Sequence, residues 1–346
     1  MIGGQTVVYE GLKMDFELSS EHKMWQRSVR DFCEQELRPY AAHVDETGEL
    51  HWDAIHKMSA VGLLGLEVPT EYGGVEMDSI GAAIAIEELG RVCGSTALSI
   101  SAHNGLGVAP IARWGRDKQK QPSLPRLLSG GYLGALALTE PGAGSDLAGG
   151  VQTSATRQDG GWVINGSKAW ITNAGKAPVI TTLLRTDREA GTSGFSMMLI
   201  DTPAPGGTIH PPEKKMGLRG SPTHMLTFED VHLDGDALLG PEGQGFPQTM
   251  ITLDSGRISI GALSVGLAQA AFEEAVRYAR QRRAFGKAIA EHQAIQWMIA
   301  DAALEIDAAR LLEDRPEVTL FVAIKRASLA RFGHDQVIPQ VLEAVR

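Results

Sequence analysis

Apolar residues recur at the spacing of buried helix faces through the first third of the chain. They stand three or four positions apart in residues 19–43, and Pro39 disrupts the end of this pattern. Further helices are predicted over three segments rich in small and apolar residues: 52–61, 80–89 and 96–114. The pattern predicts a helical N-terminal domain, to which we assign residues 1–132.

From about residue 133 the pattern changes to short segments that are apolar or alternating. Glycine, aspartate, asparagine and proline separate them, which is typical of an all-β domain. Asp159, Gly160 and Gly161 are a hairpin signal, and a turn is expected at residues 165–167. We assign residues 133–240 to a middle β domain. Its predicted strands are 133–138, 151–156, 162–165, 179–185, 195–200 and 224–228.

Helical spacing returns after Gly245. A long helix is predicted over residues 251–283, where small residues would let another helix approach closely, and a second over residues 288–312. Pro316 interrupts its continuation, and a last helix is predicted within residues 316–344. Residues 241–346 are assigned to a C-terminal helical domain. The predicted fold class is α+β, with helical, β and helical domains in chain order.

Composition and charge narrow the class of protein. The 346 residues are 43% hydrophobic and 21% charged, which is ordinary for a globular protein. A formal net charge of −10 argues against nucleic-acid partners and against binding to anionic membranes, although local arginines can still hold an anionic ligand. Cys33 and Cys93 are expected to be buried and unreactive. Without a secretory signal or a long apolar run, we expect a cytoplasmic protein without membrane insertion.

The richest chemistry lies in residues 136–146, where an apolar strand runs into Thr139, two glycines and Ser145. Glycines let the backbone approach a ligand, and the hydroxyls can donate or accept hydrogen bonds. A Gly-rich turn between strands is the alternative reading. The ten histidines show no metal-binding spacing, so no metal site is predicted. The Rossmann fingerprint is also missing, because Leu147 stands where the third glycine should be.

Four motifs stand in the order and approximate spacing of the acyl-CoA dehydrogenase family. They are TEPGAGSD (139–146), NGSKAWIT (165–172), KMGLR (215–219) and RRAFG (282–286). The chain resembles that family from about residue 19 to residue 312. The resemblance implies an FAD-dependent oxidoreductase of fatty acid metabolism that dehydrogenates an acyl-CoA thioester at its α and β carbons. A base would remove the α proton, the β hydrogen would pass as hydride to flavin N5, and an electron-accepting flavoprotein would reoxidise the flavin.

The resemblance also implies which residues bind the cofactor within one subunit. They lie along the pyrimidine side of the flavin, in the turn beside flavin and substrate, and in the segment that covers the flavin. A core tryptophan is the alternative role for the aromatic member of the last group. The matched residues are Leu136, Leu138, Thr139, Gly144, Ser145, Trp170, Ile171 and Thr172.

Other matched residues reach a neighbouring subunit or the substrate. Arg282, Phe285 and Gln293 match residues that contact the FAD of another subunit, which implies a homo-oligomer, a dimer or a tetramer. A solvated basic helix end is the alternative for Arg282. Ser145 together with Asp254 and Arg257 matches the acyl-CoA site, and an ordinary i,i+3 ion pair is the alternative for the last two.

The sequence departs from the family where the catalytic base is expected. One family position for the base precedes the helix arginine, and here Gly256 occupies it. The other belongs to a C-terminal Tyr-Glu-Gly-Thr type of motif. Gly333 is the one glycine after Gly286, so that motif is absent and the C-terminal bundle is expected to be incomplete. Glu343 is expected to be a solvated surface residue, and the catalytic residue stays unassigned.

Three alternatives follow from that departure. The chain is a shortened dehydrogenase with a displaced base, an FAD- or acyl-CoA-binding partner subunit that does not dehydrogenate, or a truncated form of an ordinary enzyme. A reduced-flavin oxygenase on the same fold is the runner-up enzyme class, since it needs no such glutamate.

Overall fold

The computed structural model describes residues 17–313 and begins with a bundle of helices. The bundle differs from the prediction in two ways: the first predicted helix ends at Glu36 and a separate helix follows it at residues 41–47, and α7, whose interior holds Pro122 and Pro125, was not predicted. Its elements are α1 (Ser20–Glu36), α2 (Ala41–Thr47), α3 (Trp52–Ala60), α4 (Ser79–Val92), α5 (Gly94–Ser101), the π-helix η3 (Ala102–Val108), α6 (Ala109–Trp114) and α7 (Asp117–Leu128).

A seven-stranded sheet follows the bundle. Its path runs β1-β4-β2-β3-β7-β6, so that β1 lies at one end, and β5 pairs with β4. The strands are β1 (Ala135–Ala137), β2 (Ser154–Gln158), β3 (Gly161–Thr172), β4 (Val179–Arg185), β5 (Phe195–Asp201), β6 (Gly207–Ile209) and β7 (Thr223–Leu233), and the short helix α8 (Leu147–Gly150) lies between β1 and β2.

The hairpin predicted around Asp159 joins β2 to β3, with Asp159 and Gly160 both at positive φ. The turn predicted at residues 165–167 is wrong. There β3 continues past an irregularity between Ile164 and Gly166 and keeps its antiparallel pairing with β7. Gly166 has a φ of +139°, so the glycine that resembles a turn signal in the sequence serves a bulge inside a strand.

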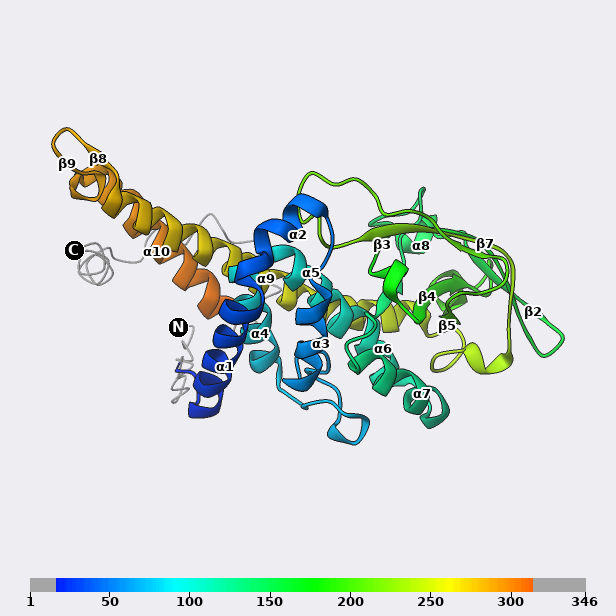
Figure 1. Cartoon of the computed structure of the whole chain (residues 1–346). Coiled ribbons are helices and arrows are strands. Elements are labelled where there is room, and N and C mark those ends of the chain that lie inside the picture. The colour runs from blue at the N-terminus through cyan, green and yellow to red at the C-terminus, as the bar shows by residue number, and fades with distance from the viewer. Residues whose placement is uncertain (1–16, 314–346) are drawn as a thin grey trace, which may run out of the picture.

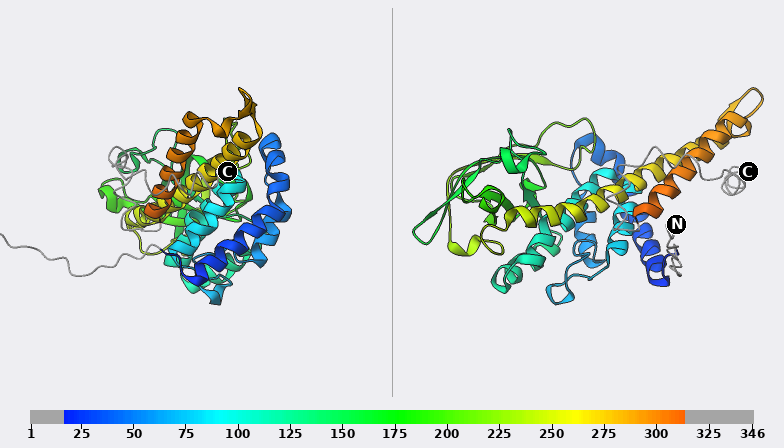
Figure 2. Two further views of the ribbon diagram at one scale, coloured as in Figure 1. Left: turned by 90° about the vertical axis from the view of Figure 1, so that its left-hand side faces the viewer. Right: turned by 180° about the vertical axis from the view of Figure 1, so that it is seen from behind.

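The long helix α9 (Gly245–Gln281) connects the two ends of the molecule. Its 37 residues span about 55 Å at 1.5 Å per residue. It starts beside the sheet, crosses the helical bundle and projects beyond it (Figures 1 and 2). A small hairpin, β8 (Arg283–Ala284) and β9 (Lys287–Ala288), turns the chain at the projecting end, and α10 (Gln293–Glu313) returns along α9. The second helix therefore begins five residues later than predicted, because residues 287–291 complete the turn.

Small residues bring α9 close to α4, as predicted. A Cβ atom on Gly266 would lie 2.2 Å from the carbonyl oxygen of Glu87, and one on Gly90 would lie 2.9 Å from that of Leu263. A side chain at either glycine would push the two helices apart. Cys33 and Cys93 are both buried, and burial raises the pKa of the Cys33 thiol to about 12, so the prediction of buried cysteines is confirmed.

Apolar contacts hold the sheet to the first part of α9. Leu136 and Leu138, around β1, belong to one buried cluster with Phe195 of β5, and Phe246 and Leu253 of α9 pack against it. This cluster fixes the end of β1 relative to α9. The helix predicted within residues 316–344, and Glu343 with it, lie outside the described residues. Between residues 17 and 313, no helix combines the length and the apolar character needed to cross a membrane.

Candidate functional site

Strand β1 is anchored at its start by a buried histidine. The ring of His103 on η3 is fully buried and lies between two backbone groups. Its Nδ1 atom accepts from the Gly134 N–H at 2.7 Å, and Nε2 therefore carries the proton that it donates to the Leu64 carbonyl at 2.9 Å. Burial lowers the pKa of this imidazole to about 4, which keeps it neutral. This arrangement fixes where β1 begins.

The end of β1 meets the second half of β3. The Ala169 N–H donates to the carbonyl of Thr139 at 2.8 Å. Lys168 Nζ donates to the Leu138 carbonyl at 3.0 Å and to Glu140 Oε1 at 2.9 Å. Two motifs separated by about 30 residues in the sequence therefore lie side by side in the structure, as the sequence analysis requires.

Trp170 projects away from the sheet. The β3–β7 pairing is irregular between Lys168 and Ile171, and within this bulge Trp170 has a φ of +62°. Its side chain is 61% exposed, so the alternative of a core tryptophan is wrong. Positive φ in a bulky residue costs about 1–3 kcal/mol and persists only where the surroundings impose it. Ile171 is buried beneath it, and Thr172 is half-buried.

The glycine-rich turn after Thr139 is open. Gly144 and Ser145 are exposed, and a Cβ atom built on Gly144 would meet nothing within 4 Å. Within residues 17–313, the side-chain hydroxyls of Thr139, Ser145 and Thr172 have no hydrogen-bond partner. Together with Trp170, these groups offer donors, acceptors and an aromatic face to a flat, polar ligand.

Leu136 and Leu138 take part in this site differently from the hydroxyl residues. Both side chains are buried, with 8% exposure, in the cluster beneath β1. Because β1 stands at the end of the strand order, one of its edges has no neighbouring strand in the path. Any ligand beside this strand would meet backbone N–H and C=O groups at that edge rather than the leucine side chains.

Two of the residues matched to the substrate lie on α9. Arg257 Nη1 is 3.0 Å from Asp254 Oδ1, and both side chains are more than half exposed, so the i,i+3 ion pair is present. Between them, a Cβ atom on Gly256 would have Leu106 Cδ2, at 3.4 Å, as its one neighbour within 4 Å among the described residues. This position on the helix has free space.

The remaining matched residues lie at the far end of α9. The Arg282 N–H closes the helix by donating to the Tyr278 carbonyl at 2.8 Å, and Phe285 in the hairpin turn is 96% exposed. Gln293 is exposed at the start of α10. The sheet lies at the opposite end of α9 (Figure 1). One chain therefore does not bring these residues to its own Thr139 and Trp170.

The motif at residues 215–219 lies in the loop before β7. Lys215 Nζ donates to the carbonyls of Leu218 and Ser221, at 2.9 and 2.5 Å. Arg219 pairs with Asp45 of α2. The motif therefore ties the β7 loop to the helical bundle. Among the described residues, no group of three or more metal-ligating side chains occurs.

Family models of known proteins match nearly all of the described residues. Three family models match in chain order: the acyl-CoA dehydrogenase N-terminal domain over 19–131, the middle domain over 135–231 and the C-terminal domain over 243–315. This chain belongs to the acyl-CoA dehydrogenase family. The predicted family and the predicted α+β fold, with helical, β and helical parts, are thus confirmed.

Relatives in this family are similar to the chain over most of their length. The probable acyl-CoA dehydrogenase YngJ of Bacillus subtilis is 47% identical, over 86% of this chain and 78% of the relative. The human mitochondrial short-chain specific acyl-CoA dehydrogenase is 44% identical, over 86% and 72%. The structure of butyryl-CoA dehydrogenase from Megasphaera elsdenii has a TM-score of 0.85 and 34% identity, covering 96% of this chain and 87% of that one.

The family also gives the cofactor. A Bacillus anthracis acyl-CoA dehydrogenase complexed with FAD is 34% identical, with a TM-score of 0.81 over 95% of this chain and 55% of that one. The chain is an oxidoreductase of this FAD-dependent family, as predicted. Sequence reasoning missed two residues of the site, Lys168 and Glu140, although both stand inside the quoted motifs. A lysine within an otherwise apolar strand segment was the available signal.

Proposed function

We propose that this chain dehydrogenates a short, straight-chain acyl-CoA thioester at its α and β carbons, with FAD bound between subunits of a homo-oligomer. The observation that carries the proposal is the meeting of the Thr139 turn with the exposed Trp170 segment, beside hydroxyls that have no partner in residues 17–313. The short chain length is supported by similarity to the human short-chain enzyme and to butyryl-CoA dehydrogenase. The electron acceptor we propose is a separate flavoprotein.

FAD, when bound, supplies the acceptor for the hydride that leaves the β carbon. The hydroxyls of Thr139 and Thr172 would hydrogen-bond to the flavin edge, and the indole of Trp170 would cover the ring and exclude water. Ser145 would lie between flavin and thioester. Hydrogen bonds to the thioester oxygen lower the barrier, because negative charge develops there as the α proton leaves.

Removal of the α proton requires a base close to that carbon with a pKa near neutrality. Gly256 occupies one family position for this base, and it has no side chain. The described carboxylates on the adjacent stretch of α9 are limited to Asp254, which is paired with Arg257. Removal of the α proton is therefore the step that distinguishes the two alternatives for this chain: a dehydrogenase or a partner subunit that does not dehydrogenate.

The geometry of α9 supports the shared site. Arg282 and Phe285 follow a helix about 55 Å long that begins against the sheet. A flavin lying beside Thr139 would be far beyond their reach within one chain, so a second copy must present them. The guanidinium of Arg282 suits the pyrophosphate of FAD, because it forms paired, charge-assisted hydrogen bonds.

The test is an anaerobic visible spectrum of the FAD-loaded chain during titration with butyryl-CoA and with longer acyl-CoAs. We expect butyryl-CoA to bleach the oxidised flavin band more completely than the longer thioesters. Bound flavin that stays oxidised with every thioester would overturn dehydrogenation by this chain and leave the partner-subunit alternative. Bleaching that favours a long-chain thioester would overturn the proposed substrate class alone.

A further inference from the structure

A fully buried ion pair lies directly behind the site. The side chain of Lys168 has no exposed surface, and that of Glu140 is 7% exposed. Lys168 Nζ donates to Glu140 Oε1 at 2.9 Å and to the Leu138 carbonyl at 3.0 Å. Lys168 stands two positions before Trp170, and Glu140 directly follows Thr139. Each member of the pair therefore lies within two positions of a residue of the proposed flavin site.

The carboxylate of Glu140 also binds the backbone that leads into β2. Its Oε2 atom accepts from the Gln152 N–H at 2.8 Å, and its Oε1 atom accepts from the Thr153 N–H at 3.0 Å. The Thr153 hydroxyl then donates to the Ser167 carbonyl at 3.0 Å. The pair thus joins three stretches of chain: the end of β1, the bulged part of β3 and the entry to β2.

This contact set fixes Thr139 from three sides. Lys168 Nζ binds the carbonyl of Leu138, just before Thr139, and the side chain of Glu140, just after it. The Ala169 N–H donates to the Thr139 carbonyl at 2.8 Å. The same lysine marks the start of the bulge in which Trp170 has its positive φ. A strained backbone conformation of this kind needs surrounding contacts that impose it. The Lys168 contacts and the Ala169 N–H bond come directly before Trp170 in the chain.

Stability alone does not account for the pair. Removing two charges from water costs several kcal/mol each, and well-packed apolar residues in place of a buried ion pair are often as stable or more so. Burial lowers the pKa of the Lys168 ammonium to about 8, and the charge of Glu140 only partly opposes this. Burial disfavours ionised Glu140 as well, but Lys168 and the hydrogen bonds from residues 152 and 153 outweigh it and lower the pKa of the carboxyl.

We propose that Lys168 and Glu140 are positioning residues that set the Thr139 hydroxyl and the Trp170 indole at the distance and angle that FAD requires. This inference rests on the proposed function, since it takes the Thr139 turn and the Trp170 segment as the flavin site. Neither residue contacts the flavin in this proposal. Glu140 acts through the adjacent Thr139, and Lys168 acts through the bulge that holds Trp170.

The test compares the wild-type chain with the double variant Lys168→Met, Glu140→Leu. The substituted side chains fill similar volume without leaving a buried charge unpaired. We expect the flavin-free double variant to melt below the wild type, because the N–H groups of residues 152 and 153 lose their acceptor, while its Kd for FAD rises about tenfold or more. The visible circular dichroism of any bound flavin should also change, because its environment becomes less ordered.

Two further variants separate positioning from stability. Glu140→Gln keeps one acceptor oxygen, enough for the N–H of residue 152 or of residue 153, and removes the charge opposite Lys168, so it should give an intermediate Kd. Leu184→Ala opens a cavity in the core of the same sheet, where Leu184 is fully buried, and should lower the melting temperature with little effect on the Kd.

Equal Kd values for the wild type and the double variant would overturn the positioning role. So would a Kd that follows the melting temperature across all variants, with Leu184→Ala affected in proportion. If the wild-type chain binds FAD but butyryl-CoA never bleaches the flavin, only the proposed dehydrogenation is overturned. The comparison of Kd values still tests the role of the Lys168–Glu140 pair. A wild-type chain without FAD affinity removes both proposals.

Discussion

At the residue scale, the same residue types serve very different purposes depending on where the fold places them. Trp170 is exposed in a bulge at positive φ, whereas Trp162 on the same strand is 2% exposed in the core. Sequence pattern alone favours the core for both. Lys168 is the reverse case, a charged residue with no exposed surface. Both exceptions fall at the proposed flavin site, where a local rule is broken for function.

Gly256 gives a direct prediction at this scale. Gly256→Glu places a carboxylate at the position that the family resemblance implies as one of two places for the base. A new Cβ atom would meet only Leu106 Cδ2, at 3.4 Å, and glycine is a poor helix residue, so α9 should tolerate the change. We expect the rate of flavin bleaching by the best acyl-CoA to rise about 100-fold or more, the typical contribution of a positioned general base. Anaerobic stopped-flow spectroscopy measures that rate.

Gly256→Gln is the matched control, because the amide has the same shape and cannot accept the proton. It should bleach no faster than the wild type. Equal bleaching by the wild type and Gly256→Glu would mean that the base already comes from elsewhere, and would contradict the view that position 256 is where it is missing.

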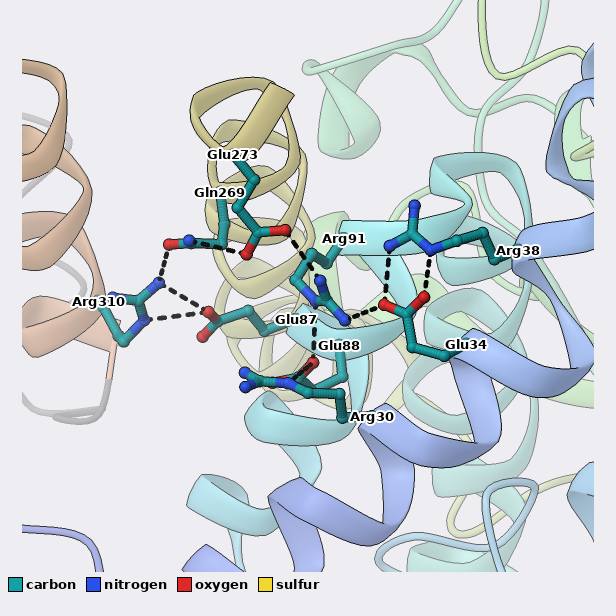
Figure 3. Close-up of polar contacts among 9 residues, drawn as sticks. All are labelled: Arg30, Glu34, Arg38, Glu87, Glu88, Arg91, Gln269, Glu273 and Arg310. Atoms are coloured by element: carbon teal, nitrogen blue, oxygen red, sulfur yellow. Dashed lines mark hydrogen bonds and ion pairs between the residues drawn. The ribbon is translucent and has the colours of Figure 1, made fainter. Parts of the chain in front are cut away.

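At the element scale, a network of charged side chains joins four helices (Figure 3). Arg91 of α4 is 8% exposed and binds Glu34 of α1, Glu88 of its own helix and Glu273 of α9. Arg310 of α10 binds Glu87 of α4 at 3.0 Å and Gln269 of α9 at 2.9 Å. The network ties the projecting hairpin of α9 and α10 to the N-terminal bundle, in addition to the close α4–α9 packing.

This network predicts a specific response to acid. Hydrogen bonds from Arg38, and those from Arg91, lower the pKa of Glu34 from 4.5 to about 2, although desolvation opposes ionisation. A carboxyl whose pKa is lower in the folded state stabilises the fold above about pH 4.5, and this stability is lost as the pH falls towards 2. Glu34→Gln should therefore melt below the wild type at pH 7, and the difference should shrink between pH 4.5 and pH 2.

Thermal unfolding followed by circular dichroism across that pH range measures the effect. The size will be modest, because Glu34 is 37% exposed and water screens its ion pairs. Glu274→Gln, at an exposed i,i+3 pair with Arg277, is the control and should change the melting temperature less at every pH. A constant difference between wild type and Glu34→Gln from pH 7 to pH 2 would contradict the assignment.

Comparison of predicted and observed elements shows which local signals are reliable. Strand β4 was predicted with its observed bounds, because β-branched and apolar residues follow one another there between turn residues. Strand β3 was predicted far too short, since Gly166 resembles a turn until its pairing with β7 is known. Helix α7 was missed because of its two prolines. It is held by tertiary contacts, including hydrogen bonds from Gln119 to the carbonyls of Asp236 and Leu238.

The residues of the candidate site also fall into those that the sequence predicts and those that it does not. Its hydroxyl residues and glycines follow from motifs that can be read along the chain. The Lys168–Glu140 pair does not, because its members are 28 residues apart and neither position has a periodic pattern. Only the fold brings a lysine in one motif against a glutamate in the other.

At the scale of the whole molecule, the two halves of the proposed cofactor site lie at opposite ends of α9 (Figure 1). One half is the Thr139 turn with Trp170, and the other is Arg282 with Phe285. A substitution can therefore disrupt one half of the cofactor site and leave the other half of the same chain intact. Gly144→Leu would fill the open space beside Ser145, where a Cβ atom meets no other atom within 4 Å. Arg282→Ala would remove the proposed pyrophosphate contact from a side chain for which no hydrogen bond occurs within residues 17–313.

Mixed oligomers of these two variants then provide the sharpest test of a shared site. In a dimer with one Gly144→Leu protomer and one Arg282→Ala protomer, one site receives both defects and the other receives none. Each variant alone should lose FAD, while mixed dimers isolated by two different affinity tags should recover about half of the wild-type flavin per protomer. Flavin absorbance per protein concentration measures this. If each protomer supplied both halves of its own site, mixing would restore nothing, and Arg282 would be what its exposed position also permits, a solvated cation at a helix end.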